Sequence, residues 1–412
     1  MARSPLTLAA AATAALASAG GTGIGIVGAA PLTEDGAGRF DSALLHLDDG
    51  SRLVVRVPAT ADAEAELVRE TQALAALTAG VRAVLPVVAP EIRGTARLGD
   101  GVARVVTHLD GYRVDAAHVP AGRGVATSLA EAIAAVHDLP ASVVQSAGLP
   151  VRTAPMVHAD TERLLDRAEA TGRLPFGLLR RWSRALTAEG LWRFEPTVTL
   201  GGVDPAAFTF TDVDGVPTIR GLLTWGGLGV GDPAEDLRWT SSGPDAAAAV
   251  FAAYTAHAHH SPDAMIAERA RLHAELEFAK WLVHGHEVGS ESIMDDAVAL
   301  LESLDESVRD APPIAAGTVT VDDAIAALGR VPEPRSDAVD TSMQTDAYDP
   351  GSMDLFGEDE EQTRPADSTD LETEPIEFSD WPGTDAAAPE ADEDRDPDDA
   401  ARNALRRWTG TA

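Results

Sequence analysis

The sequence predicts an α+β fold in two lobes, a β-rich N-lobe and a helical C-lobe, followed by a disordered acidic C-terminal tail. Short β-patterned runs separated by turn residues dominate up to about residue 110. The apolar periodicity then becomes helical up to about residue 310, interrupted by one hairpin segment. Residues 331–412 carry 24 Asp and Glu against 6 Arg, which separates them from the folded body.

Residues 1–21 are predicted to form an N-terminal helix. Ser4 can cap it, Pro5 suits its first turn, and the Gly20-Gly21 pair ends it. A signal peptide is the alternative, because an Ala-Ser-Ala site follows the apolar run. Only two Leu precede Ala12, so we favour the helix and a cytoplasmic protein. No run reaches the roughly 20 apolar residues of a membrane span, and no membrane partner is expected.

Residues 22–110 form the predicted N-lobe. A small antiparallel meander is expected, punctuated by DGAG and DDGS turns, over residues 23–32, 39–47 and 52–59. A helix is expected over Asp62–Leu77, where leucines are spaced for burial on one face. Two further strands fit within residues 84–98 and 101–114.

Residues 111–312 form the predicted C-lobe, and the crevice between the lobes is the natural ligand site. The expected helices are Ser128–His137, Asp160–Ala170, Pro175–Thr187, Pro244–His257, Pro262–His284 and Ser290–Val308. The interrupting segment, residues 198–237, has the pattern of a strand, a tight turn, a β-hairpin and an acidic loop.

The composition excludes several classes of site. The absence of cysteine excludes disulfides, thiol nucleophiles and Cys-ligated zinc. The net charge of −34 argues against direct binding of nucleic acid, which needs a basic face. Lys280 is the only lysine, so arginine must take any role that lysine usually fills.

Six motifs between residues 20 and 310 are typical of one enzyme family. LVVRVP, RETQAL and EAIAAVHDLP fit a cation-bearing strand, a helix with its Glu partner, and a helix that ends in a His. LGGVDPAAF, LLTW and GVGDPAEDL stand in the order of HGDxHPxN, IDW and VGDPxxDL. In these motifs the chain resembles the aminoglycoside and macrolide phosphotransferases, which share the protein-kinase-like fold. The resemblance implies that fold and an ATP-dependent phosphotransferase ancestry.

The same resemblance shows which groups this chain lacks. It places Leu200 at the His of HGD, Gly202 at the catalytic Asp, Ala207 at the metal-binding Asn and Thr224 at the metal-binding Asp. Phosphoryl transfer needs a carboxylate that orients the acceptor hydroxyl and oxygen ligands for Mg²⁺. Glycine and alanine have no side-chain oxygen, and a Thr hydroxyl is a weak ligand for a hard cation. We therefore expect a phosphotransferase-like pseudoenzyme with no catalytic residue, metal site or cofactor.

Two other functions stay open. A true O-phosphotransferase of the aminoglycoside or macrolide type would need a displaced acid, for which Asp204 is the candidate, and only this reading requires ATP and Mg²⁺. Alternatively, the chain is an interaction protein that acts through its tail. The sequence does not identify the small molecule or protein that would be bound.

Four charged residues have structural and functional interpretations. Arg56 takes the place of the phosphate-contacting Lys, and Glu70 that of its partner. They form an ion pair that holds the first N-lobe helix against the sheet, or they contribute to nucleotide binding. Asp232 and Asp236 of GDPAEDL are expected to accept hydrogen bonds that fix their loop. Their presence beside the missing acids indicates a scaffold that was kept without its chemistry.

Residues 313–412 form the predicted tail. Residues 331–400 have too few large apolar side chains to offset the entropy of ordering, and only DDAARNALRRW suggests a short terminal helix. Two apolar clusters interrupt the acidic sequence, one with Leu355 and Phe356 and one with Trp381. They are stray hydrophobic residues of a linker or short motifs for a protein partner. SMDLF resembles the pentapeptide that bacterial DNA-metabolism proteins insert into the sliding clamp.

Overall fold

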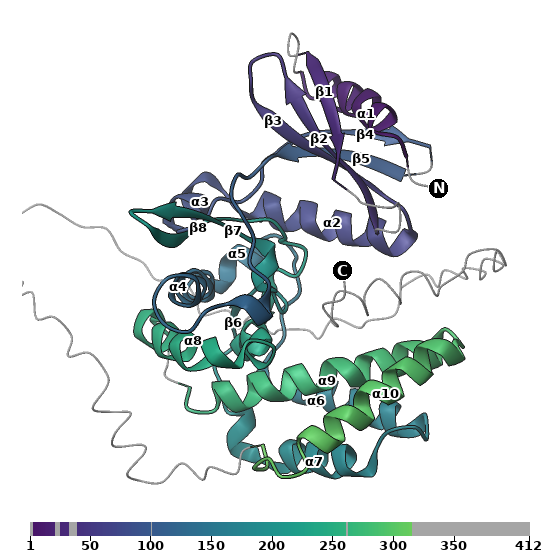
Figure 1. Cartoon of the computed structure of the whole chain (residues 1–412), viewed down its shortest axis with the longest axis vertical. Coiled ribbons are helices and arrows are strands. Elements are labelled where there is room, and N and C mark those ends of the chain that lie inside the picture. Colours follow the sequence, from purple (N-terminus) through teal and green to yellow (C-terminus); the bar gives the residue numbers. More distant parts are fainter. Residues whose placement is uncertain (1–2, 21–24, 33–38, 100, 261–262, 315–412) are drawn as a thin grey trace, which may run out of the picture. The chain divides into compact units, whose positions relative to one another are not determined.

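The computed structural model describes residues 3–20, 25–32, 39–99, 101–260 and 263–314, and every structural statement below concerns these residues (Figure 1). They belong to one compact unit of the chain. The tail residues Leu355, Phe356 and Trp381 lie outside them, so their role as partner contacts stays a prediction. None of the described helices has the length and apolar character that crossing a bilayer requires.

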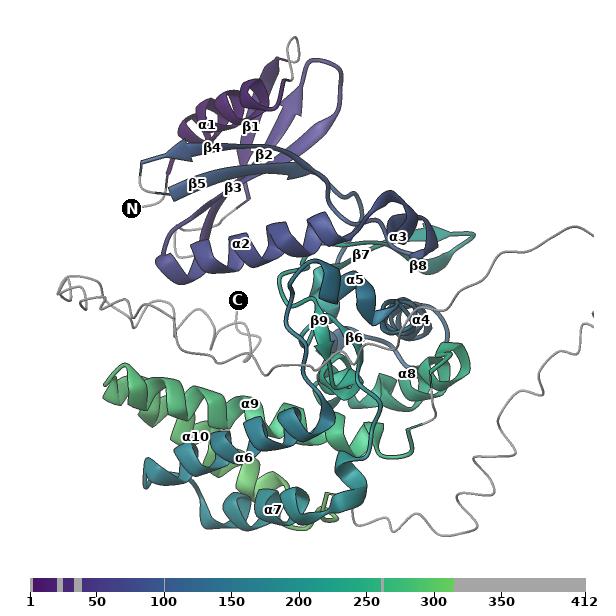
Figure 2. The ribbon, with the colours of Figure 1, turned by 180° about the vertical axis from the view of Figure 1, so that it is seen from behind.

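The N-lobe is a five-stranded antiparallel sheet with the order β1-β2-β3-β5-β4 (Figures 1 and 2). Its strands are β1 (Ile26–Pro31), β2 (Phe40–Leu47), β3 (Arg52–Pro58), β4 (Ile92–Leu98) and β5 (Gly101–Thr107). The first three strands form the expected meander, whereas β5 inserts between β3 and β4. The strand expected within residues 84–98 begins only at Ile92, because Pro86 and Pro90 cannot donate to a ladder.

Two helices lie against opposite faces of this sheet (Figures 1 and 2). Helix α1 (Pro5–Ser18), capped by Ser4, contacts all five strands and buries Leu8 and Ala12 among the apolar residues of one face. Because successive strand residues point to opposite faces, Arg56 on β3 projects away from α1. It meets α2 (Ala61–Ala76), which is the helix expected over residues 62–77.

The C-lobe contains two apolar cores. The first joins α4 (Val125–His137) and α8 (Pro244–His257) to the hairpin of β7 (Phe208–Val213) and β8 (Val216–Leu222) and to the short pair β6 (Thr197–Thr199) and β9 (Gly229–Gly231). The second joins α6 (Ala154–Ala170), α7 (Phe176–Thr187), α9 (Ile266–Glu287) and α10 (Glu291–Ser307), which group together in both views.

Most helices lie within a few residues of the expected bounds, and two larger differences occur. Helix α6 begins at Ala154 rather than Asp160, because Pro155 is tolerated in a first turn, where no intrahelical N–H is needed. The six-residue helices α3 (Ala79–Val84) and α5 (Ala141–Ser146) were not predicted. Such short helices do not complete two turns, so they show no apolar periodicity.

Backbone hydrogen bonds attach the hairpin to the segment before β4 and to the segment after β5. The N–H of Val88 donates to the carbonyl of Arg220, and the N–H of Leu222 donates to the carbonyl of Val88, both at 3.0 Å. Tyr112 and Phe210 exchange a similar pair of bonds at 3.0 and 2.8 Å. The position of the hairpin, and of the loops at its ends, is therefore set by strand-like pairing.

Helix α1 approaches the sheet most closely at Gly94 on β4. A Cβ atom added to Gly94 would lie 2.3 Å from the carbonyl oxygen of Ala15, a backbone atom that cannot rotate away. We expect Gly94→Ala to lower the free energy of unfolding by about 1–3 kcal/mol, measured by denaturant titration, because the helix has to move off the sheet.

Gly28→Ala on β1 is the matched control, since its added Cβ would have no neighbour closer than 3.7 Å. We expect this variant to remain within about 0.5 kcal/mol of the parent protein. Equal destabilisation by both substitutions would contradict the close contact between α1 and β4.

Candidate functional site

The segment after β6 forms a glycine turn that packs directly on the loop after β8. Gly201 and Gly202 have φ values of +74° and +86°, a backbone region that favours glycine. A Cβ atom added to Gly227 would lie 2.1 Å from the carbonyl oxygen of Leu200, so the two loops touch through their backbones. The N–H of Leu223 donates to the carbonyl of Ala207 at 2.8 Å. These contacts bring together the regions of the three degenerate positions, 202, 207 and 224.

The carboxylate of Asp236 accepts hydrogen bonds from the backbone of the glycine turn. Its oxygens accept the backbone N–H groups of Leu200 and Gly202 at 2.6 Å and of Val203 at 3.2 Å. The Nε2 atom of His137 lies 3.0 Å from the same carboxylate, and both side chains are fully buried. Burial alone would raise the pKa of Asp236, but these hydrogen bonds outweigh it and the pKa is lowered. Asp236 is therefore a charged anchor of the turn.

His137 extends this anchor into a buried polar chain that the sequence did not reveal. Its Nδ1 atom lies 2.7 Å from the hydroxyl of Tyr254, which lies 3.0 Å from Nε2 of His260. Nδ1 of His260 in turn lies 3.2 Å from Asp138. Burial is the main cause that raises the pKa of Tyr254 far above its usual range, so its hydroxyl stays protonated and can donate. The VHDLP motif supplied His137 and Asp138 but gave no sign of Tyr254 as partner.

Asp232 belongs to a second buried cluster. It accepts two hydrogen bonds from Arg269, at 2.9 and 3.1 Å, and Nε2 of His273 lies 2.8 Å away. These partners outweigh the effect of burial and lower the pKa of Asp232 far below its usual range. Arg269 is itself fully buried and stacks over Phe194. Pro233–Ser241 form a 3-10 helix in place of the expected acidic loop, and Asp232 at its N-cap ties this helix to α9.

An arginine lies where a side chain at position 202 would begin. A Cβ atom added to Gly202 would be 1.8 Å from Nη1 and 2.4 Å from Cζ of Arg238. Arg238 lies 3.7 Å from Glu277, whose other cationic partner is Lys280 at 2.5 Å. The position that the resemblance assigns to a proton-accepting carboxylate thus contacts a guanidinium group. Sequence reasoning missed Arg238, although it stands only two residues after Asp236.

The other positions of the family motif offer little in the way of ligands. Leu200 is buried in the core and Ala207 is apolar, while Thr224 is exposed and carries a neutral hydroxyl. Asp204 is exposed, and its carboxylate accepts the N–H of Ala206 at 2.8 Å as the cap of a short 3-10 helix. Mg²⁺ prefers carboxylate and phosphate oxygens in octahedral geometry. The residues present therefore do not fit the Mg²⁺–ATP complex that such a site would hold.

Arg56 and Glu70 form the ion pair of the structural interpretation. Their side chains meet at 2.7 Å, and the Arg56 guanidinium also lies 4.2 Å above the Phe40 ring. Burial raises the pKa of Glu70, and burial lowers the pKa of the neighbouring Arg104 to about 10. Glu70 also lies close to the loop after β8, since a Cβ atom added to Gly226 would be 3.8 Å from its Cβ. Contact of Arg56 with a nucleotide stays a prediction.

Comparisons with known proteins place these features in context. A profile of the phosphotransferase enzyme family (APH) matches residues 33–274. The apoenzyme of macrolide 2'-phosphotransferase MphH from Brachybacterium faecium is similar, with 23% identity, a TM-score of 0.58, and coverage of 69% of this chain and 97% of that chain. The GDP complex of aminoglycoside 2'-phosphotransferase-IIIa has 19% identity and a TM-score of 0.57, covering 69% and 94%. No curated protein matches. The predicted kinase-like fold is confirmed.

Replacing Asp236 tests its anchoring role. We expect Asp236→Asn to lower the free energy of unfolding at neutral pH by about 2–4 kcal/mol, because the amide group faces backbone donors that it cannot satisfy. The lowered pKa of Asp236 contributes stability above the ordinary carboxyl value of about 4, and this contribution is lost as the pH falls. Denaturant titrations across that range should therefore show a weaker acid dependence in the variant.

Asp204→Asn is the control for this substitution, since Asp204 is exposed and asparagine also caps helices. Its stability should stay within about 0.5 kcal/mol of the parent protein. If Asp236→Asn were equally harmless, the turn would not depend on the buried carboxylate.

The contact between Gly202 and Arg238 predicts an energetic coupling. Gly202→Ala adds backbone strain, at a φ of +86°, which should cost about 1–2 kcal/mol, and the flexible end of Arg238 has to move away as well. Combining it with Arg238→Ala removes the need for that movement, so a double-mutant cycle should show a coupling of about 0.5 kcal/mol.

Gly148→Ala isolates the strain, because Gly148 has a φ of +66° and no atom within 4 Å of an added Cβ. It should cost only about 1–2 kcal/mol and should not couple to Arg238→Ala. Zero coupling at position 202 would show that Arg238 lies elsewhere in solution.

Proposed function

Because the chain belongs to the phosphotransferase enzyme family, we propose that it is a non-catalytic member. It acts as a kinase-fold scaffold that binds a small molecule or a protein without Mg²⁺-dependent phosphoryl transfer. One observation carries the proposal, namely the guanidinium of Arg238 beside Gly202, at the place of the family's proton-accepting carboxylate. A permanent cation takes up no proton, so it cannot replace the base.

The expected loss in the rate of phosphoryl transfer supports this proposal. Removing a general base alone typically costs about 10²–10⁴ in rate. Metal binding in this type of site uses side-chain oxygens at two further positions, and here these are Ala207 and Thr224. The cation nearby also opposes the approach of Mg²⁺, since like charges repel strongly where water is partly excluded. The three changes act on one reaction step, so no single one of them needs to abolish transfer.

The alternative enzyme receives less support from the geometry. Asp204 would have to leave its helix cap to serve as a displaced base, and its exposed position gives it no partner that positions a substrate hydroxyl. Tail-mediated interaction, the third reading, depends on residues outside those described. A cytoplasmic location remains part of this proposal.

The similar enzymes give two candidate classes of ligand for this proposal, since one is a macrolide and the other an aminoglycoside phosphotransferase. Charges of both signs lie near Gly202, because the carboxylates of Asp236 and Glu277 accompany the cations Arg238 and Lys280. The local charge therefore does not select between the two classes.

We expect ATP with Mg²⁺ to stabilise the protein no more than ATP alone, because the residues at 202, 207 and 224 add no metal ligand. Thermal melts with each nucleotide mixture measure this difference. Incubation with ATP, Mg²⁺ and a panel of macrolides and aminoglycosides should yield no phosphorylated product by mass spectrometry, with an active phosphotransferase as the assay control.

A variant that restores the family's groups serves as the matched comparison. Gly202→Asp, Ala207→Asn and Thr224→Asp, combined with Arg238→Ala to remove the collision, should gain a Mg²⁺-dependent rise in melting temperature with ATP. Product formation by the parent protein would overturn the proposal. Loss of that activity in Asp204→Asn would then establish the displaced-acid enzyme.

A further inference from the structure

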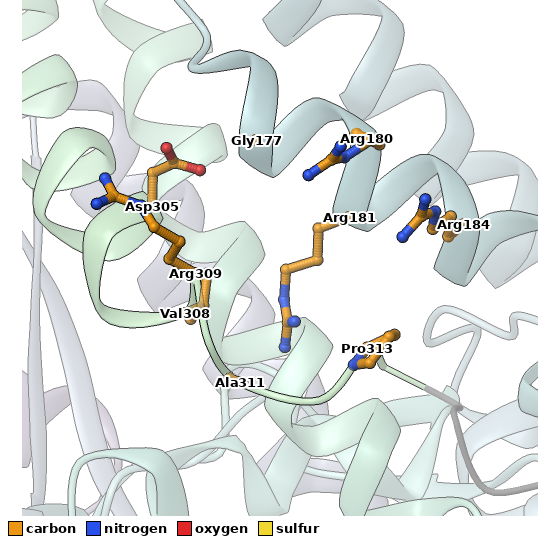
Figure 3. A pocket seen from close by; sticks show the side chains of 9 residues that line it. All are labelled: Gly177, Arg180, Arg181, Arg184, Asp305, Val308, Arg309, Ala311 and Pro313. Atoms are coloured by element: carbon orange, nitrogen blue, oxygen red, sulfur yellow. The ribbon is translucent and has the colours of Figure 1, made fainter.

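A cavity of about 400 Å³ lies at the surface of the C-lobe, between one face of α7 and the end of α10 (Figure 3). Arg180, Arg181 and Arg184 line it from α7, and Arg309 and Asp305 line it from the end of α10 and the turn that follows. Its volume lies within the range of small-molecule sites. None of these residues belongs to the degenerate transfer site, so the cavity has to be explained separately.

One of the arginines is a fixed part of the wall. Nε and Nη2 of Arg181 donate to Glu275 at 3.0–3.2 Å, and Nη1 donates to the carbonyl of Pro312 at 3.0 Å. Arg271 donates to the same carbonyl at 2.8 Å. Glu275 also accepts the indole N–H of Trp182, so the ion pair is anchored in the core. This network holds the segment 311–313, which closes one side of the cavity.

The other three arginines of the cavity wall differ from Arg181 in exposure and in pairing. Arg180, Arg184 and Arg309 are exposed, and their guanidinium groups have no hydrogen-bond or ion-pair partner among the described residues. Asp305 is the one acidic residue of the lining, and its carboxylate lies against Gly177 in the first turn of α7, where the helix dipole favours a negative charge. The four arginines of the lining carry four positive charges, whereas Asp305 and the nearby Glu275 carry two negative charges. The cavity therefore carries an excess of two positive charges.

We infer that this cavity binds a small anion that carries phosphate groups. Guanidinium groups present paired donors that match phosphate oxygens, and they form stronger hydrogen bonds with charged acceptors than with neutral ones. Several guanidinium groups gather in one recess of a chain whose net charge is −34, so the local field there attracts a compact anion. The inference is independent of the proposed function, because none of the residues that carry it belongs to the degenerate transfer site.

Calorimetric titration of the full chain with inorganic pyrophosphate tests the site. Pyrophosphate should bind more tightly than inorganic phosphate, and the affinity should fall with ionic strength. The double variant Arg180→Gln with Arg184→Gln should bind at least about tenfold more weakly, since two of the charge-assisted partners are lost. Arg69→Gln on α2 is the matched control, because Arg69 is also exposed and has no described partner, and its affinity should be unchanged.

A variant that should strengthen binding shows that weaker binding in the arginine variants is not caused by a general loss of folding. Asp305→Asn removes the one acidic charge of the lining and should tighten pyrophosphate binding severalfold. Three results would overturn the inference: no heat of binding, binding that the double arginine variant leaves unchanged, or an equal loss in Arg69→Gln. Citrate that binds as tightly as pyrophosphate would overturn the assignment to phosphate.

Discussion

The buried carboxylate of Asp236 is the interaction on which the rest of the site depends. Removing this charge from water costs several kcal/mol unless its oxygens are satisfied, and here three backbone N–H groups and His137 satisfy them. Those bonds fix the glycine turn, and the position of this turn sets the contact of Leu200 with Gly227. Because Arg238 follows Asp236 by two residues, the hydrogen bonds of Asp236 also fix the backbone from which the Arg238 guanidinium reaches Gly202.

Under the proposed function, this arrangement explains how a phosphotransferase fold persists without the family's groups at positions 202, 207 and 224. Asp232 and Asp236 are buried, and their hydrogen bonds run to backbone, arginine and histidine within the protein, so they contribute to stability whether or not a reaction occurs. Acids that face a metal site contribute no such bonds when no metal is bound, and they repel one another. The side chains that the family has at positions 202, 207 and 224 serve the reaction, and this chain lacks them. It keeps Asp232 and Asp236, whose carboxylates stabilise the neighbouring segments.

The sequence predicted what depends on local pattern and missed what depends on tertiary contact. Helices α7 to α10 were placed within a few residues because their apolar periodicity extends over three or more turns. The pairing of β3 with β5 was not foreseen, because strand order is a non-local property. Likewise the motif spacing located Gly202, but nothing in the spacing shows that Arg238, 36 residues later, lies against it. The Tyr254 partner of His137 was missed for the same reason.

Burial decides which arginines of the C-lobe hold the fold and which remain available to a ligand. Arg269 is 0% exposed and Arg181 is 9% exposed at its side chain, and each meets a carboxylate through two donor atoms, as a desolvated charge requires. Arg238 is partly exposed, and it meets Glu277 only at 3.7 Å. Arg180, Arg184 and Arg309 keep their hydration and need no partner for stability. The chain has 66 acidic residues, yet the described ones leave these last guanidinium groups unpaired. Because Arg180, Arg184 and Arg309 are unpaired and also line one cavity, they mark the surface where an anion gains most by binding.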